Sequence, residues 1–252
     1  MTDRASRALW PEGIDRILLD SVPSTMTEAA RLAPDLARPT WIMARRQTDA
    51  KGRQGRVWRT GAGNLAATYV LRPEGDPGGA ALRSFLAANA LFETLAFWTD
   101  RTRLAVKWPN DVLLNGGKVA GILLEAMGSS GRVDWLSVGV GVNLVSAPAA
   151  DPDRPIVPVS LRSEGITPPS PEEFLTLLAM NYATEERIFA DLGFQPIRET
   201  WLENAARLGE TIIARSMRET VTGIFETVDE AGRLILKTPN GMRKITAADV
   251  FF

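Results

Sequence analysis

The sequence predicts an α+β protein with a large mixed domain, residues 1–207, and a small all-β domain, residues 208–252. Up to about residue 207, strand-forming segments alternate with segments whose apolar residues follow helical spacing. The last 45 or so residues instead hold short β-rich runs, split by turn signals at Asp229–Gly232 and Pro239–Gly241. The chain has 252 residues, 45% of them apolar, which suffices for one sizeable core and a smaller one. The C-terminal pattern predicts a small antiparallel barrel.

The first third of the chain is predicted to form strands and two helices. The stretch ILLDSVPSTMTEAARLA predicts a strand followed by a capped helix, in which Thr25 and Glu28 fit a capping box and Ser24 is a rival N-cap. Two β-rich runs, 41–44 and 64–71, flank a polar segment that is longer than a hairpin needs. Residues 79–98 predict an apolar helix with these core positions: Leu82, Phe85, Leu86, Phe92 and Leu95.

The second half of the large domain is predicted to end in two helices. Residues 144–169 are rich in Pro, Ala and Asp and predict a long irregular connection. A helix then begins after Ser170, with Pro171 at its first position and Glu173 closing a capping box, and it continues to about Phe189. A second helix covers roughly 196–207.

Two residue types are missing from the chain, which excludes several kinds of chemistry. It has no cysteine, so disulfides, thiolate catalysis and zinc–thiolate sites are excluded. It has no histidine, so Ser–His–Asp triads and imidazole bases are excluded as well. The net charge of −1 provides no overall basic field for nucleic acid or membrane. The N-terminus shows no signal peptide, and no apolar run reaches about 18 residues, so we expect a cytoplasmic protein.

The hairpin within KWPNDVLLNGGKVAGILLE, residues 107–125, carries charges where a core strand favours aliphatic residues. Asn115-Gly116 is a strong signal for a two-residue hairpin loop. That loop pairs Asp111 with Ala120 and places Asp111 and Lys118 on one face, roughly 7–8 Å apart. A three-residue loop would shift this register and separate them. The pair is either a structural ion pair or part of a ligand site, because an isolated buried charge is costly.

The strand DWLSVGVGVNL has two different faces. One face carries valines, and the other carries Gly139, Gly141 and Asn143. Glycine weakens a strand unless something must approach its backbone closely. The glycine face therefore indicates either the floor of a ligand site or close packing of a helix on the sheet.

The segment RRQTDAKGRQGRVW concentrates positive charge around glycines. Backbone amides at glycines and arginine side chains suit an anion such as a triphosphate, although a solvated basic loop or a nucleic-acid patch would look similar. The chain contains no G-x-x-x-x-G-K-[ST] motif, so this is not a P-loop, and GVGVNL lacks the third glycine of a dinucleotide fingerprint. The basic residues are Arg45, Arg46, Lys51, Arg53, Arg56 and Arg59.

Together these segments resemble the biotin protein ligases. The family pattern is a Ser-Thr pair after the first strand, then G-R-x-x-x-G-R-x-W, K-W-P-N-D, G-x-K-x-A-G-I-L-x-E and G-x-G-x-N. Here the same order reads Ser24-Thr25, KGRQGRVW, KWPND, GGKVAGILLE and GVGVNL. The resemblance covers residues 17–145 strongly, and the C-terminal barrel matches in kind. It implies a mixed sheet flanked by helices, as in class II synthetases, followed by an SH3-like barrel.

The resemblance also implies a two-step reaction. Biotin and ATP give biotinyl-5′-AMP and pyrophosphate, and biotin then passes to a lysine of a biotin carboxyl carrier domain of a carboxylase. Because a carboxylate attacking a phosphorus brings two anions together, the site must be cationic. The catalytic cations implied are Lys118, Arg53 and Lys107. Magnesium is expected, since oxygen ligands suit it. Its candidate ligands are Asp111 and Asn143.

The family match assigns binding residues position by position. The biotin contacts implied are Ser24, Thr25, Gln47, Lys51, Gly52, Arg53 and Lys118. The nucleotide contacts implied are Arg53, Arg56, Trp58, Lys107, Asn110 and Asn143. The basic loop departs from the common A-G-R-G-R-R-G-R, because it reads DAKGRQGR, and its grip on the adenylate is expected to be weaker.

Two rival functions stay open. Lipoate ligases share the fold and the acyl-adenylate chemistry, but their R-R-x-x-G-G-G stretch with a following histidine is absent here. A non-enzymatic biotin or nucleotide binder is the other rival, and it would not need two lysines at the reacting carbon. About 20 residues precede the Ser-Thr pair, too few for the winged helix of family members that repress transcription, so no DNA partner and no membrane partner are expected. The sequence leaves the oligomeric state open, a homodimer included.

Overall fold

A seven-stranded mixed sheet forms the frame of the larger domain in the computed structural model, which describes residues 10–73, 77–129, 131–151, 156–216 and 219–252. The strand order is β1-β2-β3-β7-β6-β5-β4. Only the β1–β2 pair is parallel among the pairs of this sheet in the described part of the chain. The strands are β1 (Asp15–Val22), β2 (Thr40–Gln47), β3 (Leu65–Leu71), β4 (Leu104–Lys107), β5 (Asp111–Leu114), β6 (Gly117–Met127) and β7 (Trp135–Val142).

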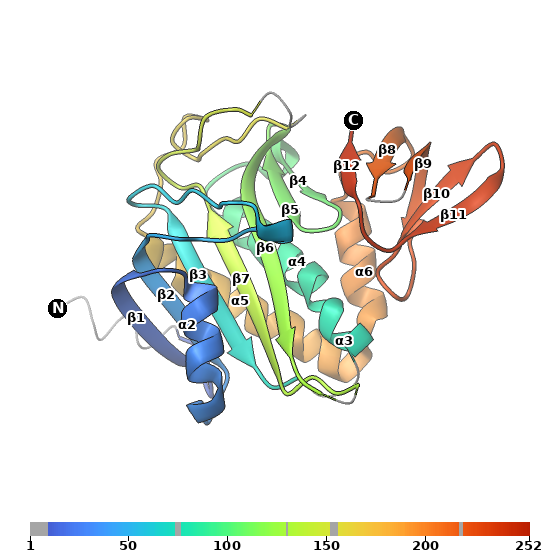
Figure 1. The fold of residues 1–252 in the computed structure, drawn as a ribbon. Helices are drawn as coiled ribbons and strands as arrows, with labels where there is room; N and C mark the ends of the chain where they lie inside the picture. Colours follow the sequence, from blue (N-terminus) through green and yellow to red (C-terminus); the bar gives the residue numbers. More distant parts are fainter. Residues whose placement is uncertain (1–9, 74–76, 130, 152–155, 217–218) are drawn as a thin grey trace.

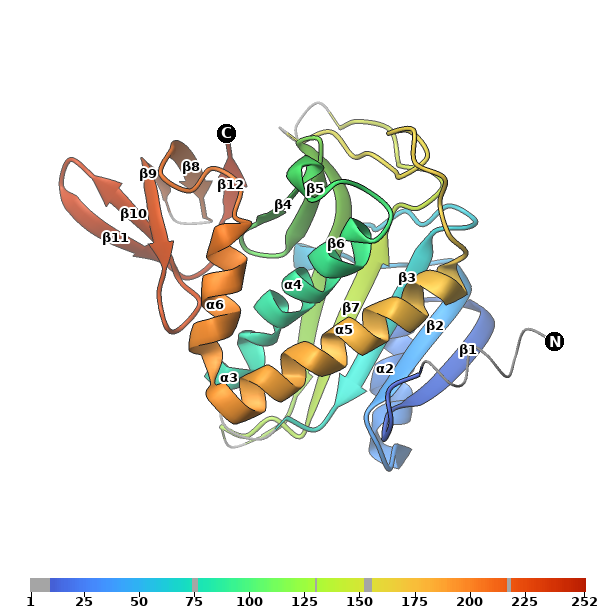
Figure 2. The same cartoon turned by 180° about the vertical axis from the view of Figure 1, so that it is seen from behind.

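Helices cover both faces of this sheet, as Figures 1 and 2 show. The short helix α2 lies on one face, and α4 and α5 cross the other. The alternation of β2 supplies both cores: Trp41 and Met43 pack into the large core beneath α4 and α5, whereas Ile42 packs with Ala29 of α2. The helices are α2 (Thr25–Leu32), α3 (Pro77–Ala81), α4 (Arg83–Ala96), α5 (Pro171–Leu192) and α6 (Phe194–Glu203).

The predicted N-terminal helices are present, with two corrections. Ser24 is the N-cap of α2, because its hydroxyl accepts from the Met26 amide, and Glu28 pairs with Arg31 instead of closing a box with Thr25. The helix predicted over 79–98 is divided into α3 and α4 at Leu82, after two glycines of low helix propensity. The five predicted core positions of this segment are all buried.

The predicted C-terminal helices are present with different ends. The capping box of Ser170 and Glu173 forms as predicted, and α5 runs three residues past the expected Phe189, to Leu192. The second helix was predicted to reach residue 207, but α6 ends at Glu203. The reason is tertiary: the Val106 amide donates to Asn204 O, and the Ala206 amide donates to Val106 O, so this segment covers the free edge of β4. The described parts of 144–169 carry no named helix or strand, as predicted, and residues 152–155 lie outside the described residues.

The hairpin has the predicted two-residue loop but a different register beyond it. Leu114 pairs with Gly117, and Leu113 pairs with Lys118. A bulge then shifts the ladder, so that Asp111 lies opposite Gly121 and not opposite Ala120. The prediction of the Asp111 partner was therefore wrong by one residue. Asp111 and Lys118 nevertheless meet in an ion pair, so the prediction that they lie on one face is confirmed.

The C-terminal residues form a separate antiparallel sheet of order β11-β10-β9-β8-β12, in agreement with the predicted small β domain. It packs beside α6, where the Trp201 and Phe225 rings lie 6.4 Å apart, and the Trp108 indole donates to Gly232 O at 3.1 Å. Both views place β12 next to β4 (Figures 1 and 2). The strands are β8 (Thr211–Arg215), β9 (Thr220–Val228), β10 (Leu234–Thr238), β11 (Gly241–Ile245) and β12 (Asp249–Phe251). Across the described ranges, none of the helices has the length and apolar character that a bilayer crossing requires.

Candidate active site

Two adjoining pockets contain every site residue that the sequence predicted. A pocket of about 110 Å³ lies between the start of α2, the loop after β2, and strands β6 and β7. A larger one of about 740 Å³ lies between the same loop, residues 148–158 and strand β12. Lys118 and Asp111 line both. The first pocket also holds Ser24, Thr25, Gln47, Lys51, Gly52, Arg53, Arg56, Trp58 and Asn110. The second also holds Arg56, Trp58, Lys107 and Asn143.

A network of hydroxyl and amide groups closes the inner end of the smaller pocket. Gln47 Oε1 accepts from the Thr25 amide at 2.8 Å and from the Thr25 hydroxyl at 3.1 Å. The Gln47 amide donates to Thr60, and the Thr68 hydroxyl donates to Thr25 at 2.9 Å. The network offers hydrogen bonds to a small polar group. Sequence reasoning missed Thr68 and Thr60, although a lone threonine in the apolar strand LAATYVL was a signal for the former.

Arg53 is oriented by an asparagine that is itself held by β6. Asn110 donates from its side chain to Ile122 O at 2.6 Å and accepts at its own carbonyl from the Ile122 amide at 2.9 Å. Its Oδ1 then accepts from Arg53 Nη1 at 3.1 Å. Burial lowers the pKa of the Arg53 guanidinium below its ordinary value, partly offset by Asp249 and Asp111. A desolvated cation of this kind binds an incoming anion strongly.

Trp58 accounts for one glycine in each of β6 and β7. A Cβ atom on Gly141 would lie 2.5 Å from the indole, and one on Gly121 would lie 3.0 Å from it. The indole therefore rests directly on the backbone of both strands. At Gly139 a Cβ atom would instead lie 2.6 Å from Met26 Sδ of α2, so the predicted alternative of close helix packing holds at that end of the glycine face. Lys118 Nζ lies 5.4 Å from the Trp58 ring centroid, a cation–π distance.

Lys118 and Asp111 form an ion pair, with Nζ and Oδ1 2.5 Å apart. Both side chains are mostly buried, at 25% and 14% exposed. Lys107 lies opposite Asp111 in the β4–β5 strand pair, and the residue is only 7% exposed. Burial lowers the pKa of Lys107, and the positive charges of Lys118 and Arg53 lower it further, against the opposite effect of Asp111 and Asp249.

The backbone of Lys118 pairs along one side with the segment of residues 157–166. The Lys118 amide donates to Val157 O, and the Val159 amide donates to Lys118 O, both at 2.9 Å. Asn143 is buried, and its amide group donates to Val159 O at 3.0 Å. The structure thus places Asn143 as a brace for this segment. Its Nδ2 is engaged by protein carbonyls.

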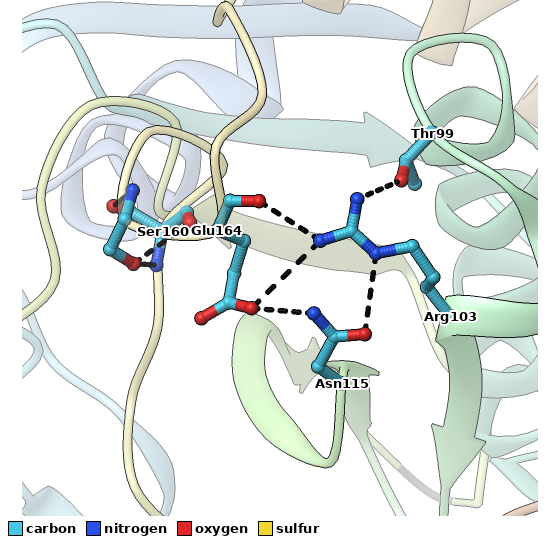
Figure 3. Close-up of polar contacts among 6 residues, drawn as sticks. Thr99, Arg103, Asn115, Ser160 and Glu164 are labelled. Carbon is cyan, nitrogen blue, oxygen red and sulfur yellow. Dashed lines mark hydrogen bonds and ion pairs between the residues drawn. The ribbon is translucent and has the colours of Figure 1, made fainter.

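Figure 3 shows how the far end of the same segment is tied to the hairpin turn. Asn115 donates to Glu164 Oε2 at 2.6 Å, and Arg103 donates to Glu164 O at 2.9 Å. Arg103 also donates to Thr99 and to Asn115 Oδ1. Because the turn and the segment are held together, Lys118 starts from a fixed backbone.

One charged residue of the site had no sequence signal. Asp249 comes from β12 and lines both pockets, and its Oδ2 lies 2.6 Å from Arg56 Nη2. Burial would raise the pKa of Asp249, but the hydrogen bond and charge of Arg56, with Arg53 and Lys107, hold that pKa below its ordinary value. The residues that line the two pockets include six cations and three carboxylates, and this excess of positive charge leaves the site able to take a polyanion.

Comparisons with known proteins agree with this geometry. Residues 18–143 match the biotin/lipoate A/B protein ligase family, and residues 208–252 match the biotin protein ligase C-terminal domain. The chain is 50% identical to a biotin--[acetyl-CoA-carboxylase] ligase of Paracoccus denitrificans over 93% of this chain and 99% of that protein. It is 30% identical to the bifunctional ligase/repressor BirA of Bacillus subtilis over 92% of this chain and 72% of that one. In fold it is similar to the biotin protein ligase of Aquifex aeolicus in complex with biotin and ATP, with a TM-score of 0.80 and 24% identity over 94% and 98% of the two chains.

Proposed function

Because the chain belongs to the biotin/lipoate A/B protein ligase family, we propose that it is an ATP-dependent biotin protein ligase. It activates biotin to biotinyl-5′-AMP with release of pyrophosphate. It then transfers biotin to a lysine of a biotin carboxyl carrier domain of a carboxylase. We place the catalytic domain at residues 1–207 and the C-terminal domain at 208–252.

The position of Lys118 is the observation that carries this proposal. It lines the small pocket, which suits the acid, and the large one, which suits the nucleotide. A carboxylate in the first and an α-phosphate in the second would meet beside its ammonium group. Arg53 lies on the side of the small pocket and Lys107 on the side of the large one, so the meeting point is cationic from both directions.

The chemistry follows from this arrangement. An oxygen of the biotin carboxylate forms a bond to the α-phosphorus, and the bond from that phosphorus to the pyrophosphate oxygen breaks. Lys118 and Arg53 reduce the repulsion between the two anions and stabilise the charge on the transferring phosphoryl group. In the second step the amine of the carrier lysine attacks the acyl carbon, and AMP leaves with the C–O bonding electrons. A mixed anhydride is short-lived in water, so the reaction needs a loop that covers the site and excludes water.

The remaining predicted residues divide into contacts and braces. We assign Ser24, Thr25 and Gln47 to the polar ring of biotin, together with the backbone at Lys51 and Gly52. We assign Arg56 and Trp58 to the nucleotide. Asn110 and Asn143 act through other groups, since Asn110 orients Arg53 and Asn143 holds the segment beside Lys118.

Magnesium fits this site as a companion of ATP. The described residues contain no cluster of three carboxylates that could hold a metal ion by itself. Magnesium commonly uses one or two carboxylates together with substrate phosphates, and Asp111 is such a carboxylate at the junction of the pockets. Bound there, the ion would neutralise phosphate charge.

Biotin-dependent exchange between ATP and labelled pyrophosphate tests the proposal, with lipoate as the control acid. A ligase for biotin exchanges label with biotin and not with lipoate, and it labels a purified carrier domain when that is added. Exchange that depends on lipoate would identify the rival acyl ligase. Biotin or ATP binding without exchange would identify a non-enzymatic binder.

A further inference from the structure

Strand β12 brings a carboxylate of the C-terminal sheet into the site of the larger domain. Arg56 and Asp249 are 193 residues apart in sequence, yet they meet in a two-point contact, with Nη2 to Oδ2 at 2.6 Å and Nη1 to Oδ1 at 3.5 Å. The strand that carries Asp249 is fixed by pairing with β8 and by the buried side chain of Val250. The contact is therefore built into the docking of the two sheets.

The surroundings of Asp249 keep it negatively charged at neutral pH. Burial acts in the opposite direction, but Arg56, Arg53 and Lys107 together hold its pKa low. Arg53 and Lys107 are desolvated themselves and need a counter-charge when no substrate is bound. Asp249 supplies that counter-charge where the triphosphate is proposed to bind.

We propose that Asp249 is an internal counter-anion that occupies Arg56 in the nucleotide-free enzyme and gives way to the phosphates of ATP. This inference rests on the proposed function. The physical reason is that a carboxylate and a phosphate use the same forked face of a guanidinium, and here the carboxylate already engages Nη1 and Nη2. ATP binding must then displace Asp249 from Arg56, so this residue weakens ATP binding and links nucleotide occupancy to the C-terminal sheet.

The test compares the wild-type protein with Asp249→Asn and Asp249→Ala. The matched control is Glu219→Gln, whose carboxylate pairs with Arg243 at 2.8 Å in the same sheet, away from both pockets. For each protein, KM for ATP, KM for biotin and kcat are measured by biotin-dependent pyrophosphate exchange, together with the melting temperature. We expect KM for ATP to fall about threefold to fivefold in both Asp249 variants, since a partly exposed charge contact has an effect of this order.

Three further readouts separate displacement from a merely structural role. If Asp249 only competes with ATP for Arg56, its removal lowers the KM for ATP and leaves kcat and the KM for biotin within about twofold of wild type. The gain in ATP binding shrinks when salt is raised from about 0.02 M to about 0.5 M, because the repulsion removed is screened. Glu219→Gln changes neither KM.

The outcomes that overturn the inference are distinct from failure of the proposed function. A wild-type protein without exchange would refute the function. Normal wild-type exchange with an unchanged KM for ATP in the Asp249 variants would refute only the counter-anion. A raised KM would make Asp249 a positioning residue for Arg56, and unfolding of both variants would make it a structural anchor. Either result would overturn the inference.

Discussion

Replacing Lys118 with methionine removes one charge from the junction of the two pockets and keeps the length of the side chain. The structure predicts two separate losses. The site loses the cation that both pockets share. Asp111 loses its ion-pair partner, which lay 2.5 Å from its carboxylate, and stays mostly buried. The first loss concerns the rate, and the second concerns folding.

The size of each loss follows from the geometry. A unit charge about 4 Å from a phosphate contributes about 4 kcal/mol at an effective dielectric constant of about 20. Removal of one such donor lowers rates by roughly 10²–10³-fold. For folding, the ion pair is only partly exposed, at 25% and 14%, so leaving the carboxylate behind costs about 1–3 kcal/mol. Biotin binding should fall less, because we assign the polar ring of biotin to the network around Gln47.

The assay is a double-mutant cycle in pyrophosphate exchange and urea unfolding. Lys118→Met is compared with Asp111→Asn and with the double variant, and exposed Lys244→Met serves as the control. The double variant should regain stability to within about 1 kcal/mol of wild type, because no lone charge is left buried. Its exchange rate should stay at least about 10²-fold low. Recovery of exchange in the double variant, or exchange within twofold of wild type in Lys118→Met, would refute the catalytic role.

Three other predictions follow from the site and the core. Gly141→Ala places a methyl group 2.5 Å from the Trp58 indole, so the ring must shift by about 1 Å. Pyrophosphate exchange should fall roughly 10²-fold while the protein stays folded. Exchange within threefold of wild type would show that the position of the ring is not critical. Burial raises the pKa of Glu185 to about 7, against a lowering by Asn89. The carboxyl group therefore ionises at lower pH in the unfolded chain than in the folded protein, so the free energy of unfolding falls as pH rises from 4.5 to 7. Glu185→Gln should remove this fall, which amounts to at most about 3 kcal/mol and can be measured by thermal or urea unfolding. A slope that survives in the variant would exclude Glu185 as its source. Trypsin should cut rapidly among the six basic sites between Arg45 and Arg59 in the free protein, and biotin with ATP should protect them strongly, with ATP alone protecting weakly. Mass mapping that finds equal cleavage with and without ligands would show that this loop is not the lid.

Features set by near neighbours were correctly predicted from the sequence. The capping box of Ser170 and Glu173 and the turn at Asn115-Gly116 depend on hydrogen bonds and backbone torsions within a few residues. The face of glycines in β7 was also readable, because strand alternation alone separates Gly139 and Gly141 from the valines. The predicted site residues were named from the resemblance of the motifs, because short motifs of defined chemistry can be recognised in a sequence without knowledge of their contacts.

Competing local signals and ladder register needed the structure. Thr25 with Glu28 and Ser24 offered two caps, and the packing of the helix against β2 decided for Ser24, because Thr25 is engaged by Gln47. The bulge opposite Asp111 could not be read from the hairpin loop, since the loop determines register only next to itself. The end of α6 was decided by the free edge of β4.

The chemical character of the site was determined by the sequence, and its closure by tertiary structure. The chain has no histidine and no cysteine, so its chemistry has to use other groups, and the lysines and arginines in its glycine-rich motifs suit the binding and activation of an anion. The docking of the C-terminal sheet on α6 and β4 decided which carboxylate of the protein faces those cations. That docking brings Asp249 to Arg56 across 193 residues. It depends on many weak apolar contacts between distant segments, and no local pattern of residues encodes their sum.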